Sequence, residues 1–533
     1  MKCKKILSLI LFVLIVASSF AFAEVFAADV VSDGYSFIEK TDGLYVIGSD
    51  SSVKGSISIP SSVNGKSVIG IEKNAFSGNG LINRVNIPDT IKYIGEKAFC
   101  NCVALSKVSF SGSFSTLSLS KGAFSDCQIL SDIVLPDCVT VIPDDCFKNC
   151  ITLAEFSIND NIIAIGSQAF LNCSSYKEIY IPASVSSIGS KAFVSCDSCN
   201  YFGVATSNTN YKSVNGCLYS KDGTVLIQYP IGKNAEVCSV ESTVKQILPY
   251  AFKNSKITGI NLPEGLNTIG EYCFDSCKSL SSITVPSTVT KYSYAFVSSG
   301  IINADIKSVS DIPEYAFSDC RSLKSVKLAN GISIIGLCGF YNCKSLESVI
   351  IPDTVTEIES AAFENCTSLG TVHLPASVTS INQNSFSGCA DINICCPKQN
   401  TYGWNYAVDH GFNVSVCYDH ELITGNIRII NNPGLKDLKY GETLVIKADP
   451  ASIPDGAHVE WSVKGSGYES KTSGSELRLK ATGKGTASVS AILKDSSGRE
   501  ISKANETVNL KSNIFLIIIA FFRNIFSDMT IVQ

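Results

Sequence analysis

Apolar residues recur along this chain in a fixed order, and phenylalanine marks the recurrence most clearly. Thirteen phenylalanines lie 21 to 25 residues apart, with one longer gap of 59 residues between the sixth and the seventh. A period of this length indicates a solenoid, because one unit is too small to bury its apolar side and must stack on its neighbours. The residues that mark the period are Phe76, Phe99, Phe124, Phe147, Phe170, Phe193, Phe252, Phe274, Phe296, Phe317, Phe340, Phe363 and Phe386.

Each unit carries three apolar segments. The first is L-x-x-V-x-I-P, as in residues 346–352. Its V-x-I core is β-branched with a period of two, which predicts a short strand with both apolar residues inward, ended by the proline. The second is V-T-x-I-G, as in residues 185–189, and the third is A-F-x-x-C, as in residues 316–320, where one helical turn would put Phe and Cys on one face. The pattern predicts a β-rich solenoid of parallel short strands and short helical turns.

The ends of the solenoid and its interruption have their own signals. We expect the repeats over residues 76–420 and a cap over residues 28–75, because a free first coil would expose a strand edge. The long gap contains strand-like runs on either side of Asp222-Gly223, which is a strong hairpin signal. We therefore expect a hairpin insert at about residues 197–240. After the last repeat, residues 402–407 resemble an amphipathic turn of helix, closed by Gly411.

Beyond the repeats the chain changes character. Residues 424–511 contain short alternating runs punctuated by glycine and proline, which predicts an all-β sandwich. The runs around Trp461 and residues 483–487 resemble a bacterial immunoglobulin-like domain of the invasin/intimin type, and such domains usually act as spacers. Residues 512–533 form an apolar tail whose uninterrupted apolar run is shorter than the about 20 residues of a membrane span. An unstructured end or edge strand, an interfacial helix and a partner-docking tail all fit it.

The first residues have the pattern of an export signal. Three lysines at positions 2, 4 and 5 precede an apolar run and then small residues, with A-x-A at residues 21–23 and a rival cleavage position near Ala27. We expect residues 1–27 to be a signal peptide and the protein to be secreted or displayed at the cell surface.

Composition excludes several classes of function. The net charge of −5 and pI near 5.6 argue against a nucleic-acid partner. The chain has four histidines and no nucleophile-elbow, P-loop, H-E-x-x-H or dinucleotide-binding motif, so we expect neither an enzyme nor a cofactor. Cys395, Cys396, His410, Cys417 and His420 are close in sequence. Adjacent strand residues point to opposite faces, however, so we expect no metal site there.

Ten of the 22 cysteines lie three residues after a phenylalanine: Cys102, Cys127, Cys150, Cys173, Cys196, Cys277, Cys320, Cys343, Cys366 and Cys389. An exported chain this rich in cysteine normally suggests disulfides. Equivalent residues of adjacent coils stack rather than face one another, however, and Ser255 and Ser299 replace the cysteine in two units. We therefore predict a ladder of buried free thiols that pack as small core residues.

The middle residue of each V-x-I strand should point away from the core, and these residues vary widely in character. We predict a binding surface there, with Tyr180, Ile350 and Val134 as candidate anchors because aromatic and other large side chains dominate interface energies. The candidate contact residues are Asn86, Val134, Tyr180, Asn261, Thr284, Asp305, Lys327, Ile350 and His373.

The repeated phrase resembles the BspA-type bacterial leucine-rich repeat family over roughly residues 30–415, and residues 346–366 match its consensus almost position by position. The resemblance implies an exported or surface protein, since some members bind host matrix proteins or other microbes. We therefore expect an adhesin-like protein that binds a protein or glycan on a host or neighbouring cell, with the tail as a route to membrane or cell-wall association. A structural surface spacer without a specific ligand is the alternative.

Overall fold

The computed structural model describes residues 30–416, apart from 235 and 390, and strand segments between 429 and 516. The expected signal peptide and most of the apolar tail lie outside the described residues. The chain divides into two units. The first comprises Met1–Val326, Gly336–Leu346 and Ala361–Thr367, and the second comprises Lys327–Ile335, Glu347–Ser360 and Ser368–Gln533.

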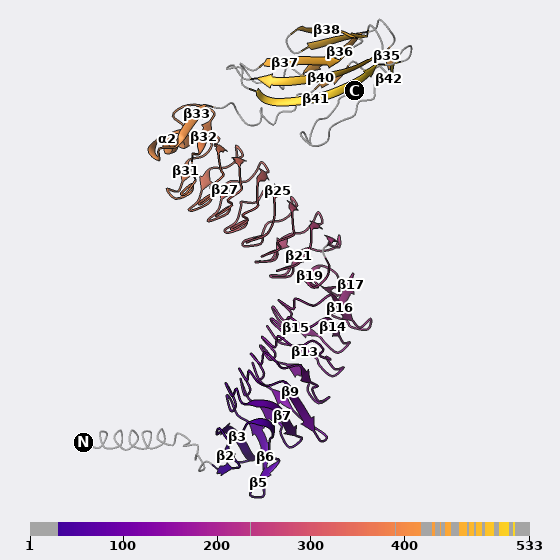
Figure 1. The fold of residues 1–533 in the computed structure, drawn as a ribbon, viewed down its shortest axis with the longest axis vertical. Helices are drawn as coiled ribbons and strands as arrows, with labels where there is room; N and C mark the ends of the chain where they lie inside the picture. The colour runs from indigo at the N-terminus through magenta and orange to yellow at the C-terminus, as the bar shows by residue number, and fades with distance from the viewer. Residues whose placement is uncertain are drawn as a thin grey trace, which may run out of the picture. The chain divides into compact units, whose positions relative to one another are not determined.

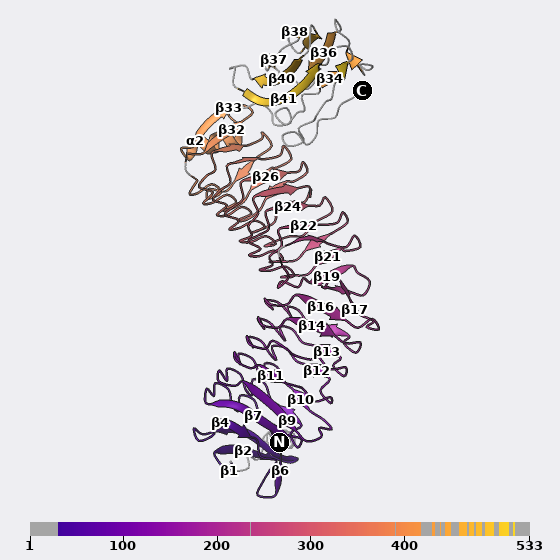
Figure 2. The ribbon, with the colours of Figure 1, turned by 45° about the vertical axis from the view of Figure 1, so that its right-hand side comes forward.

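The V-x-I segments form parallel ladders of short strands, as the sequence predicts. Figure 2 shows β4, β7, β9 and β11 side by side, and Val85 of β7 is in register with Val108 of β9. Both apolar residues of a strand point inward, as Ile179 and Ile181 do with 1% and 0% of their surface exposed. In the first unit the V-x-I strands are β4 Gly55–Ser58, β7 Ile82–Pro88, β9 Lys107–Ser111, β11 Asp132–Ile133, β14 Glu178–Ile181, β16 Tyr201–Val204, β20 Val237–Ser239, β22 Gly259–Asn261, β24 Ser282–Val285 and β25 Asn303–Ile306. Strand β26 spans Ser325–Leu328, and the second unit has β28 Ser348–Ile350, β30 Thr371–His373, β32 Asn393–Cys396 and β33 Asn413–Val416.

The V-T-x-I-G segments form a second set of parallel strands, here called the I-G strands. Their glycine is needed for the close approach of neighbouring coils, since a Cβ added to Gly189 would lie 2.3 Å from the backbone nitrogen of Ser167. In the first unit the I-G strands are β6 Lys66–Ile71, β8 Tyr93–Ile94, β10 Ser118–Leu119, β12 Val141–Ile142, β13 Ala164–Ile165, β15 Ser187–Ile188, β19 Val225–Gln228, β21 Gln246–Ile247 and β23 Thr268–Ile269. The second unit has β27 Ile334–Ile335, β29 Glu357–Ile358 and β31 Ser380–Ile381.

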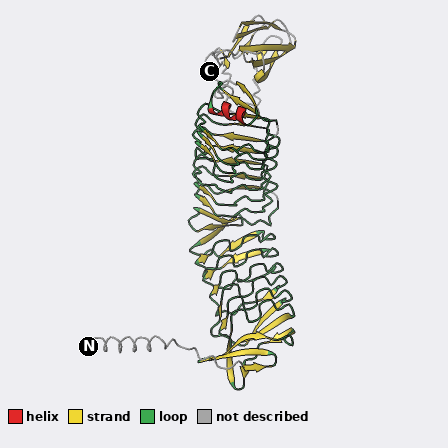
Figure 3. Cartoon of the chain, turned by 90° about the vertical axis from the view of Figure 1, so that its left-hand side faces the viewer, coloured by secondary structure: helices red, strands yellow, loops and turns green. Residues whose placement is uncertain are grey.

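The A-F-x-x-C segments are not helical turns, and this part of the predicted fold is wrong. They are successive tight turns, and Figure 3 shows loop and turn along most of the coils, with helix at α2. The residues two before and two after the phenylalanine take positive φ, as Lys97 and Asn101 do at 55° and 58° around Phe99. The Phe99 N–H therefore points to the next coil and donates to the carbonyl of Ala123 at 2.9 Å. Each turn thus adds a third line of hydrogen bonds between coils instead of a helix.

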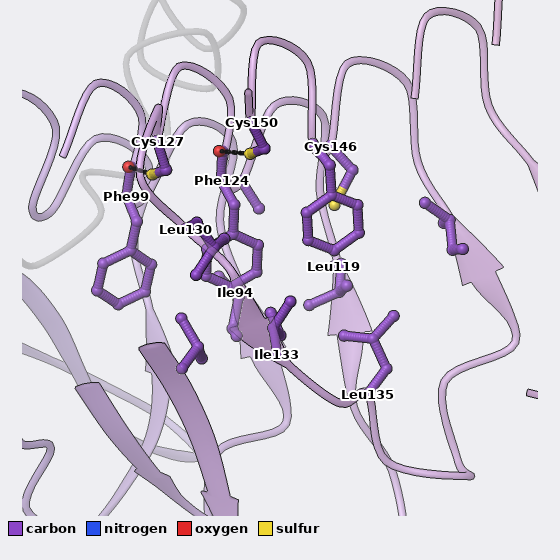
Figure 4. Close-up of a cluster of buried hydrophobic side chains, with 14 of the residues drawn as sticks. Ile94, Phe99, Leu119, Phe124, Cys127, Leu130, Ile133, Leu135, Cys146 and Cys150 are labelled. Carbon is purple, nitrogen blue, oxygen red and sulfur yellow. Dashed lines mark hydrogen bonds between the residues drawn. The ribbon is translucent and has the colours of Figure 1, made fainter. Parts of the chain in front are cut away.

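The phenylalanines stack on one another in the core. The rings of Phe99 and Phe124 (Figure 4) lie 5.5 Å apart with an interplanar angle of 6°. Those of Phe124 and Phe147 lie 5.8 Å apart at 5°. Offset stacking of this kind contributes about 0.5–1.5 kcal/mol per pair beyond the burial of the rings. The spacing along the sequence therefore sets the spacing of a continuous aromatic column within these coils.

The thiols three residues after the phenylalanines are hydrogen-bond donors as well as packing atoms. The Sγ of Cys127 donates to the Phe99 carbonyl at 3.0 Å, and the Sγ of Cys150 donates to the Phe124 carbonyl at 3.3 Å (Figure 4). The same bond recurs at Cys173, whose Sγ lies 3.0 Å from the Phe147 carbonyl. Nineteen cysteines of the described residues are free, which supports the predicted thiol ladder, and nine of its ten members are buried. Each of the nine buried ladder thiols donates to a carbonyl of the coil before it and so joins the two coils.

The first unit begins with an antiparallel element over part of the expected cap. Strands β1 Val30–Ser32, β2 Tyr35–Lys40 and β3 Gly43–Ser49 pair antiparallel in that order, and β3 then pairs in parallel with β6 (Figure 1). A short strand, β5 Ser62–Val63, pairs antiparallel with β6. The antiparallel strands therefore occupy the edge that the first I-G strand would otherwise leave open.

The insert contains the expected hairpin and one further strand. Strand β17 Tyr211–Val214 pairs antiparallel with β18 Cys217–Ser220, and β18 pairs antiparallel with β19 around Asp222-Gly223. Strand β19 then pairs in parallel with β21. The insert therefore interrupts the V-x-I ladder between β16 and β20, whereas the I-G ladder resumes within the insert itself.

The second unit contains the expected helix and a group of antiparallel strands. Helix α2 spans Tyr402–Asp409, and the Thr401 hydroxyl caps it by accepting from the Trp404 N–H at 3.2 Å. Further along, antiparallel pairing gives the strand orders β34-β36-β39-β38, β37-β40-β41 and β35-β42. These strands are β34 Ile429–Asn431, β35 Asp437–Leu438, β36 Thr443–Ala448, β37 His458–Gly465, β38 Tyr468–Ser473, β39 Glu476–Ala481, β40 Gly485–Lys494, β41 Glu500–Leu510 and β42 Phe515–Leu516.

Candidate functional site

The outward positions of the V-x-I strands hold the predicted contact residues. In the first unit, Val134 and Tyr180 have 73% and 55% of their surface exposed, although the residues on either side of each are buried. Asn261 and Thr284 are also exposed, whereas Asn86 and Asp305 are half-buried. In the second unit, Lys327 is exposed, Ile350 has 38% of its surface exposed, and His373 is half-buried.

The structure brings these residues together in pairs rather than in one site. Thr284 is in register with Asp305 in the first unit, and Ile350 is in register with His373 in the second. Within the first unit the V-x-I strands form separate sheets, because the chain lacks a strand at residues 155–158 and the insert follows β16. The predicted surface is therefore a series of local patches.

One patch of the first unit contains a residue that the sequence did not predict. Tyr201 of β16 has 50% of its surface exposed and lies in register with Glu178 of β14, two residues from Tyr180. The 59-residue gap between phenylalanines assigns Tyr201 to the expected insert, so the predicted surface does not include this residue. The signal was available, because residues 201–204 follow the strand at 178–181 after one 23-residue interval.

Glycines form the floor beneath these two tyrosines. A Cβ added to Gly203 would lie 2.9 Å from Cδ2 of Tyr180 and 3.4 Å from Cε1 of Tyr201. On the other side, a Cβ added to Gly216 would lie 3.0 Å from Cδ2 of Tyr201. Both rings therefore rest against backbone. We call Tyr180 and Tyr201 with this floor the tyrosine platform.

A second group of tyrosines was also missed. Tyr250, Tyr272, Tyr294 and Tyr315 each lie two residues before a phenylalanine, and their rings form a stack with neighbouring centroids 4.8–5.3 Å apart. All four have positive φ, between 53° and 64°, which is unfavourable for a bulky residue. The Lys191 ammonium covers the first ring at 4.3 Å from its centroid. The ring faces are therefore taken up within the stack.

Burial is the main cause of the raised pKa values of two tyrosines in the stack. Burial, with smaller contributions from Tyr250 and the Glu271 carboxylate, raises the pKa of Tyr272. Burial and the Glu314 carboxylate likewise raise the pKa of Tyr294. The hydroxyls of Tyr272 and Tyr294 are therefore neutral beside carboxylates, an arrangement that needs no ligand to explain it.

A shallow groove of about 450 Å³ lies beside the I-G strands of the first unit, and the described residues contain no group of three metal-binding side chains. Lys121, Asp144 and Ser167 are among the residues of the groove, and the Asp144 carboxylate accepts from the Ser167 N–H at 2.6 Å. The carboxylate thus has a structural partner.

Cys395, which the strand pattern places outward, is instead buried and disulfide-bonded, whereas Cys396 is buried and free.

Parallel strands, buried leucines and a turn at each phenylalanine define a leucine-rich repeat solenoid. The model of the BspA type leucine rich repeat region matches six copies, over residues 69–200, 233–321 and 291–410. These matches cover more than half of the chain, and the protein therefore belongs to this family. No curated protein matches its sequence.

Two solved structures show the same fold. A leucine-rich repeat protein from Eubacterium ventriosum is 25% identical, with a TM-score of 0.54, and the alignment covers 70% of this chain and 98% of that one. The pneumococcal vaccine antigen PcpA is 20% identical, with a TM-score of 0.56, and the alignment covers 74% of this chain and 98% of that one. Among the described residues, no helix has the length and apolar character needed to cross a bilayer.

Proposed function

We propose that this protein is an exported, adhesin-like surface protein that binds an extracellular protein or glycan of a host or neighbouring cell through its V-x-I strand face. The exposed Val134, Tyr180 and Tyr201 carry the proposal, because large side chains on a rigid strand face are suited to anchor a partner. The export-signal pattern of residues 1–27 supports a location outside the cytoplasm. The pneumococcal structure of the same fold is that of a vaccine antigen, which is in keeping with such a location.

The C-terminal part of the chain has a supporting role in this proposal. Antiparallel strands such as β37, β40 and β41 support an immunoglobulin-like spacer over residues 424–511. We assign the tail at 512–533 an association with the membrane or cell wall. Deleting residues 512–533 should then release the protein from cells, and unchanged retention would contradict the anchor. No catalytic role is assigned.

The function is tested by incubating the full chain with host matrix, mucin and bacterial cell-wall fractions and identifying what it retains. Tyr180→Asp should abolish retention, because it places a charge in the centre of the proposed contact. Ile163→Asp is the matched control, since Ile163 is also exposed, at 49%, but adjoins the I-G strand β13. Both variants should melt at the wild-type temperature, as expected of surface substitutions. Absence of any partner, or equal loss in both variants, would favour the structural spacer.

A further inference from the structure

The tyrosine platform has two ring faces with no partner inside the protein. Among the residues that the structure describes, no ring stacks on Tyr180 or Tyr201, and no group hydrogen-bonds either hydroxyl. The tyrosines of the stack differ, because each of them has a neighbouring ring within 5.3 Å. Two half-exposed, unpartnered phenols side by side are therefore a special feature of this patch.

The floor of the platform makes it flat and open. Gly203 is in register with Tyr180, and any other residue there would place a side chain between the two rings. Gly216 lets the backbone of the insert turn contact the other side of Tyr201. Gly216 follows Asn215, and both take positive φ, at 78° and 51°, as the tight turn between β17 and β18 requires. The insert therefore supports the second ring, which explains why the platform occurs at this interruption of the repeat.

The charges around the platform select among ligands. Glu178 is exposed and in register with Tyr201, and Glu155 occupies the corresponding exposed position one unit earlier. Lys233 of the insert donates to the Glu236 carboxylate at 2.8 Å and to the Asn215 carbonyl, next to Gly216, at 3.2 Å. Carboxylates accept hydrogen bonds from hydroxyl groups and repel anions, so sulfated and other acidic ligands are disfavoured.

We propose that the tyrosine platform binds a neutral glycan, with the C–H face of a pyranose on the ring of Tyr180 or Tyr201 and Glu178 accepting from a sugar hydroxyl. An aromatic face carries partial negative charge and attracts the weakly positive C–H groups of a sugar face. The inference rests on the proposed function and names its ligand class. A shallow site of this kind binds a single sugar weakly, and display of many copies on a cell surface raises the effective affinity.

The test uses the full chain and neutral oligosaccharides of glucose, galactose and N-acetylglucosamine, with heparin as the anionic probe. Titrations followed by NMR or calorimetry should give binding to at least one neutral series. Tyr180→Ala and Tyr201→Ala should each weaken it at least tenfold, whereas Tyr201→Phe should retain it, because stacking needs the ring. Tyr402→Ala, at an exposed tyrosine of α2, is the control and should leave the affinity unchanged.

Gly203→Ala provides a variant that keeps both tyrosines. Its added Cβ would displace the Tyr180 ring and should weaken glycan binding with little change in melting. Binding of heparin alone, of no neutral series, or of a neutral series equally well by the alanine variants would overturn the platform. If the full chain nevertheless retains a protein from the matrix fractions, and Tyr180→Asp abolishes that retention, the proposed function is supported and the neutral-glycan ligand is refuted.

Discussion

Replacing Cys173 by alanine tests whether the thiol ladder stabilises the solenoid. Cys173 has 0% of its surface exposed, and its Sγ donates to the Phe147 carbonyl at 3.0 Å. Alanine removes this hydrogen bond, at the low end of about 0.5–1.5 kcal/mol because a thiol is a weak donor. It also leaves a cavity near the size of a methyl group, which costs about 1 kcal/mol. We therefore expect the free energy of unfolding to fall by about 1.5 kcal/mol.

Two further variants divide this loss into its parts. Cys173→Ser keeps a donor at the same position but removes the apolar sulfur, so we expect a loss of about 1 kcal/mol. Cys100→Ala is the matched control, because Cys100 is only half-buried and its Sγ lies 3.7 Å from an Asp126 carboxylate oxygen rather than in the ladder. Its effect should stay within about 0.5 kcal/mol.

The assay is urea unfolding of the full chain in reductant, with amide hydrogen exchange as a local readout. Repeat arrays can lose cooperativity, so the global transition alone does not locate the damage. The Phe147 N–H, which donates to the Ala169 carbonyl at 2.8 Å, should exchange faster in Cys173→Ala. Equal stability of Cys173→Ala and Cys100→Ala would refute the reasoning.

Three other outcomes follow from the same packing. Denaturation without reductant should leave the ladder cysteines reactive to a thiol reagent, and blocked thiols at those positions would contradict the ladder. Burial raises the pKa of Cys173, Cys277 and Cys320 from 9.0 to about 12, so their contribution to stability is complete below pH 9. It should be lost as the pH rises from 9 towards 12, by up to about 1.4 kcal/mol per pH unit for each thiol, and Cys173→Ser should flatten that slope in urea titrations. Gly189→Ala should lower the melting temperature more than Cys173→Ala, because the added Cβ meets the backbone of the adjacent coil; a smaller effect would show that the coils can separate.

The sequence was most informative where one physical demand repeats in every unit. The period of the phenylalanines, the inward V-x-I residues and the free thiols were all predictable, because each position has the same neighbours in successive coils. The helical turn was mispredicted because i, i+3 spacing also fits a tight turn. Lys97 and Asn101, on either side of Phe99, adopt positive φ and so donate to the next coil. A lysine in the sequence does not indicate that conformation.

The candidate site was harder to predict because it depends on positions that do not repeat. The outward position of Tyr180 followed from strand alternation, and its exposure agrees. Tyr201 was missed because its strand lies where the phenylalanine spacing breaks, and the role of Gly216 depends on how the insert turn lies against the strand. The periodicity of one sequence does not predict a contact between a repeat and an irregular segment such as the insert turn.

The three lines of hydrogen bonds between coils have a consequence for how the gene can change. In the first unit, Val85 of one coil is in register with Val108 of the next, Ile142 with Ile165, and the Phe147 N–H with the Ala169 carbonyl. Each line links a given position of one unit to a fixed position of the next, so removing or duplicating a whole unit leaves every bond with an equivalent partner. Recombination between repeats can therefore lengthen or shorten the array in steps of one coil. Each added coil can carry different outward side chains while its inward residues keep the same packing.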